Sequence, residues 1–134
     1  RKILRKFERC VGEQNKKNIG CCSVSVAQCH ALLEIEEHGE TTVSVLAESM
    51  GLDKSTLSRT LDSLVKTGQV ERRESPEDRR FSIVNLSPDG HKTVNRINRE
   101  NNEFFAKIFQ GKTPEEQRNI LSVFEDLTRK LGKP

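Results

Sequence analysis

Two groups of side chains in this sequence could do chemistry, and they differ in kind. The first is a cluster of thiols, Cys21, Cys22 and Cys29, in the stretch GCCSVSVAQCHALLEI. A thiolate is a nucleophile, is open to oxidation and binds soft metal ions, so this cluster indicates redox or metal chemistry. The second group is four arginines within nine positions, on both sides of Ser-Pro-Glu-Asp. Guanidinium groups bind phosphates and carboxylates through paired hydrogen bonds, so the arginines indicate an anionic partner.

The spacing of the thiols leaves three interpretations open. Cys29 lies at the fourth position of a helix that we expect Ser25 to cap, and a helix N-terminus favours the thiolate form. A continuous helix over residues 22–29 would separate the two sulfurs by a rise of about 10 Å, too far to share one ion. The spacing is also not that of paired Cys-x-x-Cys zinc sites. The cysteines therefore sense oxidation, bind a soft metal or metalloid ion, or only pack, with Cys29 against Val24 as a hydrophobic staple. No cofactor is required.

The arginines lie on the arms and at the tip of an expected β-hairpin. VERRES and RRFSIVNLS have the composition of strands, and Pro76 lies in the turn between them. Directly before the hairpin, LAESMGLDKSTLSRTLDSLVKTG predicts helices over about 43–50, which buries Leu46, Ala47 and Met50, and over 54–67. Gly51 supplies the turn between these helices, Asp53 caps the second, and Gly68 ends it.

The second of these helices has the pattern of a helix that reads DNA. Leu57, Leu61 and Leu64, with Val65, form a stripe that must be buried, which leaves the opposite face exposed. A helix of this length, roughly 21 Å, fits the major groove, and short hydroxyls and cations suit base edges and phosphates. The expected contacts are Ser55, Thr56, Ser58, Arg59 and Lys66.

A two-stranded wing beside such a helix lies over the adjacent minor groove, where an arginine can enter. We expect Asp78 to hold Arg80 by a charge-assisted hydrogen bond, so that the guanidinium group is aimed at the groove. Arg72, Arg73 and Arg79 would contact phosphates or hold the wing to its helix. The alternative is a charged hairpin that only resists pairing with other strand edges.

Helices are also expected over residues 1–16, 26–37, 88–109 and 114–131, with a polar break at Asn15 to Gly20 after the first of them. Capping boxes mark two of their starts, at Ser25 with Gln28 and at Thr113 with Glu116. The fold class is therefore mainly α with a small β-hairpin wing.

The composition indicates that one copy does not bury all of its apolar surface. Hydrophobic residues are 33% of the 134-residue chain, against a globular average of about 45%. The apolar stripes of the first and last helices would meet in a homodimer, and they contain Ile3, Leu4, Phe7, Ile120, Phe124, Leu127 and Leu131. No stretch approaches the ~20 apolar residues of a membrane span and no secretory signal is visible, so we expect a cytoplasmic protein without a membrane partner.

The stretch from LAESMGLDK to NLSPDG resembles the winged helix–turn–helix of the MarR family of transcription regulators. Asp78 and Arg80 fall on the family's Asp-x-Arg wing motif, whereas Thr60 stands where many relatives carry an apolar residue. The serines, threonine and arginine of 55–59 match the recognition-helix contacts. The resemblance covers residues 1–131 and implies one MarR-like domain, with dimerisation helices at about 1–22 and 100–134 around a winged lobe at about 24–98.

The resemblance implies a homodimer that binds a palindromic operator in double-stranded DNA and acts as a repressor. An unknown effector would release it by changing the spacing of the recognition helices: a small molecule, thiol oxidation or a soft metal. We expect no enzymatic activity, because Cys29 and His30, the best nucleophile and base, diverge on one helix and no glycine-rich phosphate loop is present. The alternative is a winged-helix module that binds protein without DNA.

Overall fold

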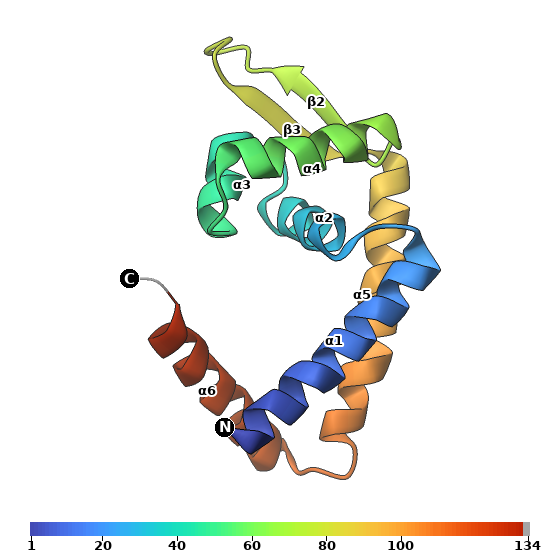
Figure 1. Ribbon diagram of the computed structural model, residues 1–134, viewed down its shortest axis with the longest axis vertical. Coiled ribbons are helices and arrows are strands. Elements are labelled where there is room, and N and C mark those ends of the chain that lie inside the picture. The colour runs from blue at the N-terminus through green and yellow to red at the C-terminus, as the bar shows by residue number, and fades with distance from the viewer. Residues whose placement is uncertain (133–134) are drawn as a thin grey trace. The chain divides into compact units, whose positions relative to one another are not determined.

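The protein was analysed as a computed structural model that describes residues 1–132, with the side chains of 18–22 left out. The chain divides into two compact units, residues 1–101 and 102–134, and each is described by itself. The elements in chain order (Figure 1) are α1 (Lys2–Cys22), α2 (Val26–His38), β1 (Thr41–Thr42), α3 (Val43–Ser49), α4 (Lys54–Lys66), β2 (Val70–Glu74), β3 (Ser82–Leu86), α5 (Pro88–Phe109) and α6 (Pro114–Leu131). The mainly helical fold class with a small β wing is confirmed.

Local capping signals fix where the helices begin. The Ser25 hydroxyl accepts from the Gln28 amide, and the Gln28 side chain accepts from the Ser25 amide, which is the capping box predicted for α2. Thr113 and Glu116 form the same reciprocal pair at the start of α6. These bonds satisfy amide groups that the first turn of a helix leaves without partners.

The core of the first unit lies between α2, α3, α4, the sheet and the first half of α5. Leu57, Leu61 and Leu64 of α4 are fully buried, as the i, i+4, i+7 spacing predicts. Val65 is 38% exposed, so its assignment to the buried stripe was wrong; it follows Leu64 by 100° around the helix and points past the core. The other fully buried large side chains are Leu32, Ile35, Leu46, Val84, Val94 and Ile97.

The wing is an antiparallel hairpin of β2 and β3, with Val70 opposite Leu86 and Glu74 opposite Ser82. The two-residue strand β1, which was not predicted, pairs with the other edge of β3 and gives the order β1-β3-β2. Strand β3 begins only at Ser82, so Arg79 and Arg80 belong to the tip and not to a strand.

Three predictions about helix boundaries and burial need correction. Helix α1 continues to Cys22 through the polar segment expected to break it, because that segment contains no proline and a single glycine does not end a helix. Asp53 is the N-cap of α4, but its side chain makes no cap hydrogen bond; its carboxylate accepts from the Thr56 hydroxyl instead. Met50 follows α3 and is only partly buried, although it packs against the core.

The start of α5 is fastened to the end of α4. The Ser87 amide donates to the Gln69 carbonyl (3.0 Å), and the Ser87 hydroxyl bridges the Gly68 carbonyl and the Gly90 amide. Gly90 lies against the Gln69 backbone, where an added Cβ would come within 2.0 Å of the carbonyl oxygen.

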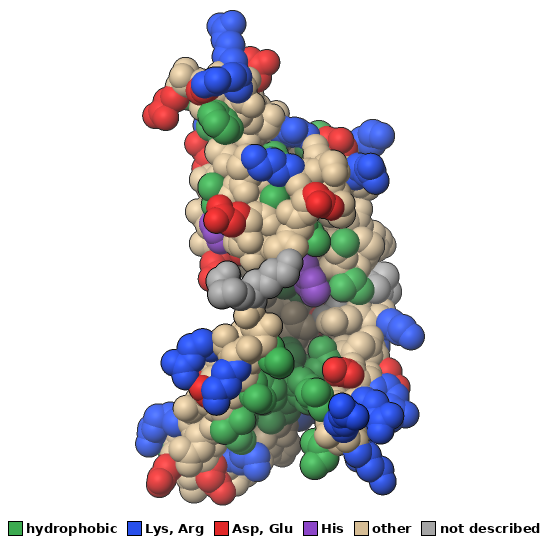
Figure 2. Space-filling view, turned by 60° about the vertical axis from the view of Figure 1, so that its left-hand side comes forward, with side chains coloured by type: hydrophobic (Ala, Val, Ile, Leu, Met, Phe, Trp, Pro, Cys, Tyr) green, Lys and Arg blue, Asp and Glu red, His purple; other side chains and the backbone are tan. Residues whose placement is uncertain are grey.

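Both units expose large hydrophobic side chains (Figure 2). In the first unit these include Ile3, Leu4 and Phe7 of α1. Helix α6 has no buried residue, and its exposed apolar side chains are Leu121, Val123, Phe124, Leu127 and Leu131. No helix in the described part of the chain is long and apolar enough to cross a membrane.

Candidate nucleic-acid interface

The face of α4 opposite the leucine stripe is exposed and carries hydroxyls and cations, as predicted. Ser55, Thr56, Arg59 and Lys66 are exposed and Ser58 is half-buried. Arg59 and Lys66 form no ion pair with the residues that the structure describes, so both charges are available to a partner. The Thr56 hydroxyl donates to a carboxylate oxygen of Asp53 at 3.1 Å.

At the tip of the wing, Asp78 orients Arg80 through a dense set of hydrogen bonds. The Asp78 carboxylate accepts from Arg80 Nε at 3.0 Å, from Nη2 at 2.7 Å and from the Arg80 amide at 3.0 Å. The hydrogen bond from the Arg80 side chain, followed by that from its amide, holds the pKa of Asp78 below its ordinary value of 3.8. The guanidinium group stays exposed, with 86% of the side chain accessible. The predicted pairing of Asp78 with Arg80 is therefore present.

Arg72 and Arg73 are adjacent in β2 and point to opposite faces of the strand. Arg72 Nη1 donates to Asp62 Oδ1 of α4 at 2.8 Å and to Ser58 Oγ at 3.3 Å. Arg73 Nη2 contacts both carboxylate oxygens of Glu40 at 2.7 Å. Of the two roles expected for these arginines, the contacts match the one that fastens the wing. Arg79 is exposed and has no ion pair within the described residues.

A cavity of about 400 Å³ lies in the angle between α3, α4 and the wing. Its lining combines hydroxyl groups with three cations and includes Ser44, Lys54, Ser55, Ser58, Arg72 and Arg80. Hydroxyls and cations that converge in one groove suit the oxygens of an anionic backbone. Lys54 and Ser44 were not among the predicted contacts, although their positions at the starts of the two helices could have indicated them.

Only part of the predicted cysteine cluster lies within the described residues. The side chains of Cys21 and Cys22 lie outside the described residues. Cys29 is buried in the core cluster, which also contains Val24, and Cys10 is exposed. Within the described residues, no group of three His, Cys, Asp or Glu side chains is placed to hold a metal ion.

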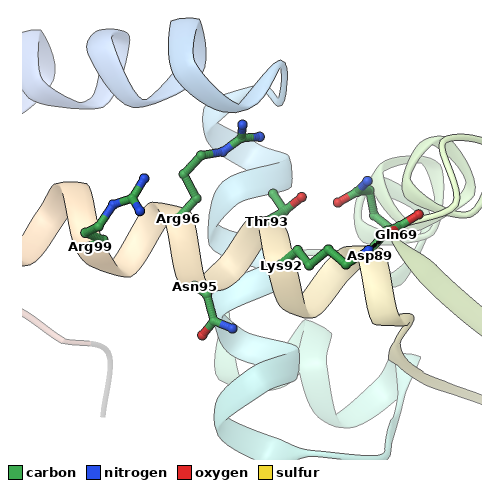
Figure 3. Close-up of a pocket in the computed structure, with 7 residues that line it drawn as sticks. All are labelled: Gln69, Asp89, Lys92, Thr93, Asn95, Arg96 and Arg99. Atoms are coloured by element: carbon green, nitrogen blue, oxygen red, sulfur yellow. Dashed lines mark hydrogen bonds and ion pairs between the residues drawn. The ribbon is translucent and has the colours of Figure 1, made fainter.

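A second, larger cavity of about 590 Å³ lies beside the first half of α5 (Figure 3) and was not predicted. Lys92, Arg96 and Arg99 line it at i, i+4, i+7 spacing, a cationic stripe that the sequence could have shown. Gln69, directly after Gly68, contributes a buried Oε1 that has no hydrogen-bond partner within the described part of the chain. Two arginines and an unsatisfied acceptor favour an occupant that has both a negative charge and a donor group.

A helix–turn–helix whose second helix exposes hydroxyls and cations beside an arginine-tipped hairpin is a DNA-binding winged helix. Comparison with known proteins agrees. Residues 24–81 match the MarR family. YfiV, an uncharacterised HTH-type transcriptional regulator of Bacillus subtilis (strain 168), is 31% identical over 108 residues, which span 81% of this chain and 68% of YfiV.

Solved structures show the same fold. A MarR transcriptional regulator from Methanosarcina mazei Go1 superposes with a TM-score of 0.82 at 22% identity, over 96% of this chain and 93% of that one. A MarR variant from E. coli, solved in complex with operator DNA, superposes with a TM-score of 0.75 at 20% identity, over 93% and 92% of the two chains. The chain belongs to the MarR family of transcriptional regulators.

Proposed function

We propose that the protein is a homodimeric, sequence-specific repressor that binds a palindromic operator in double-stranded DNA and acts in the cytoplasm. The observation that carries the proposal is the joint exposure of the α4 face and of Arg80, whose guanidinium group Asp78 holds in one orientation. A side chain that is already ordered loses less conformational entropy when it binds.

The contacts divide between two grooves and the backbone. Ser55, Thr56, Ser58 and Arg59 read the major groove, Arg80 enters the minor groove, and Lys66 and Arg79 contact phosphates. Arg72 and Arg73 act indirectly, by holding the wing. The E. coli regulator that was solved in complex with operator DNA has the same winged-helix fold, which supports DNA as the partner.

A second copy of the chain supplies the other recognition helix. Each unit exposes an apolar helix face, with Ile3, Leu4 and Phe7 in one unit and Leu127 and Leu131 in the other. Burying such a face against a second copy is favourable by about 25 cal/mol per Å² of apolar surface removed from water. A two-fold dimer places its recognition helices about one DNA turn apart, ~34 Å, and so reads a palindrome.

Release from DNA follows a signal that shifts α4. The cavity beside α5 is the proposed site for a small organic anion, because its unsatisfied acceptor, Gln69, is separated from α4 only by Thr67 and Gly68. The cysteines remain the proposed sensor of thiol oxidants or soft metals, through Cys21, Cys22 or Cys29. Because Cys29 is buried, a reagent reaches it only after local opening.

The experiment that tests the DNA-binding proposal is selection of bound duplexes from a random pool, followed by a titration of affinity against salt. A regulator should enrich a palindrome, and its affinity should fall steeply with salt because each phosphate contact releases counterions. Arg80→Ala should weaken binding to the enriched duplex at least tenfold without changing Tm, whereas Arg1→Ala, which changes the same charge far along the chain from the winged helix, should not. Failure to bind any duplex at low salt would contradict the proposal and favour a protein-binding module.

A further inference from the structure

One residue on the DNA-facing side of α4 has the wrong charge for that position. Asp62 lies one helical turn after Ser58, on the face that also carries Arg59 and Lys66, and 55% of its side chain is exposed. A carboxylate at this position repels phosphates, so an interface built only for affinity would not carry it.

The structure shows what Asp62 contacts. Its Oδ1 accepts from Nη1 of Arg72 in β2 at 2.8 Å, and the same nitrogen lies 3.3 Å from Ser58 Oγ. The guanidinium group thus bridges two residues one turn apart on α4, and 29% of the Arg72 side chain remains exposed. This side-chain bridge joins the wing to the exposed face of α4.

The opposite face of β2 is held at the neighbouring residue. Arg73 contacts both oxygens of Glu40, in the segment between α2 and β1. Successive side chains of a strand point to opposite faces, so the two ion pairs hold β2 from both of its faces. A rotation of the wing about its own axis would therefore lengthen one pair or the other.

We propose that Asp62 is a positioning residue that determines specificity: through Arg72 it sets the distance between the recognition helix and the wing. This proposal rests on the proposed DNA-binding function. The protein can read a site in two grooves at once only when Arg59 and Arg80 are held at a fixed separation. Asp62 therefore lowers affinity for any duplex through its charge and raises the preference for the correct one through the geometry that it imposes.

The two roles are separated by Asp62→Asn, which keeps the shape of the side chain and removes its charge. The matched control is Glu74→Gln in the same wing, because Glu74 is exposed and forms no ion pair with the described residues. Affinities for two fluorescein-labelled duplexes are measured by anisotropy: the duplex that the wild-type protein enriches from a random pool, and a scrambled duplex of the same composition. Thermal melting checks that both variants are folded.

Asp62→Asn should bind the scrambled duplex as tightly as wild type or tighter, while the preference for the enriched duplex falls about tenfold. Glu74→Gln should leave that preference unchanged. Arg72→Gln should lower the preference as well, and the double variant should lose no more than the larger single loss, because both changes remove one contact.

Two results would overturn the assignment. One is that Asp62→Asn raises the affinity for both duplexes by the same factor, which would mean that Asp62 only withholds Arg72 from phosphates. The other is a change of preference no larger than that of Glu74→Gln. Absence of any duplex preference in the wild-type protein is a different outcome, and it would overturn the proposed function together with this inference.

Discussion

Replacing Gly90 by alanine should destabilise the protein, although alanine is the better helix former. Gly90 lies in the first turn of α5 and is buried against the Gln69 carbonyl, so an added Cβ would lie 2.0 Å from that oxygen. Since Cβ atoms essentially never come closer than 3.0 Å to such an atom, the start of α5 and the backbone after α4 must separate by about 1 Å.

The magnitude follows from what this separation disturbs. Overpacking a filled site costs about 1–3 kcal/mol. The hydrogen bond from the Ser87 amide to the Gln69 carbonyl, 3.0 Å long, would weaken, and such a bond contributes about 1 kcal/mol. The helix propensity of alanine offsets up to about 1 kcal/mol of this. The net loss should be about 2 kcal/mol, which lowers Tm by roughly 8 °C for a chain of this size.

Gly12→Ala is the matched control, because Gly12 lies inside α1 and an added Cβ there meets nothing within 4 Å. The same substitution should stabilise the protein at this position by up to about 1 kcal/mol. Both variants are compared with wild type by urea denaturation and thermal melting at equal protein concentration. If Gly90→Ala melts at or above the wild-type temperature, the backbone contact between α5 and Gln69 is not as close as described.

Three further outcomes are expected. Arg59→Ala should relax base preference as well as affinity, which repeated selection of duplexes would show as a degenerate half-site; an unchanged half-site would remove Arg59 from the base contacts. The pKa of Asp78 is lowered, so its pairing with Arg80 is complete above the ordinary value of 3.8 and is lost as the pH falls below it. Carboxyl NMR should therefore give a midpoint below 3.8 that rises in Arg80→Ala. Since Asp78 stays ionised between pH 5 and 8, its titration should not change duplex affinity in that range. Ser25→Ala should cost about 1 kcal/mol by denaturation, through loss of the α2 capping box.

The elements that the sequence predicted well are those with a signal within four or five residues. Both capping boxes, the leucine stripe of α4 and the hairpin around Pro76 have local patterns, and all are present. The unpredicted strand β1 is only Thr41–Thr42, too short for any alternation, and it forms because the edge of β3 is open to it. The predicted end of the first helix relied on composition, which is a weak guide where no proline intervenes.

In the candidate site too, features that depend on neighbouring residues were predictable, and features that depend on distant residues were not. The pairing of Asp78 with Arg80 spans two residues and was predictable, whereas Arg73 finds Glu40 at a separation of 33 residues. The period of a strand predicts that Arg72 and Arg73 point apart, but not which carboxylates meet them. The unsatisfied oxygen of Gln69 depends on the packing of α5 against the end of α4, and no short pattern encodes it.

The unequal roles of the wing arginines follow from the marginal stability of a small hairpin. Two five-residue strands gain little from pairing alone and need further contacts to keep one orientation. Arg72 and Arg73, within β2, supply such contacts to carboxylates outside the hairpin, and Arg80 is fixed by a carboxylate at the tip itself. Because Arg80 is already ordered within the protein, the wing can present its guanidinium group to DNA without ordering it at the moment of binding. Guanidinium–carboxylate pairs thus hold strand β2 in place and also orient the arginine at the tip of the wing.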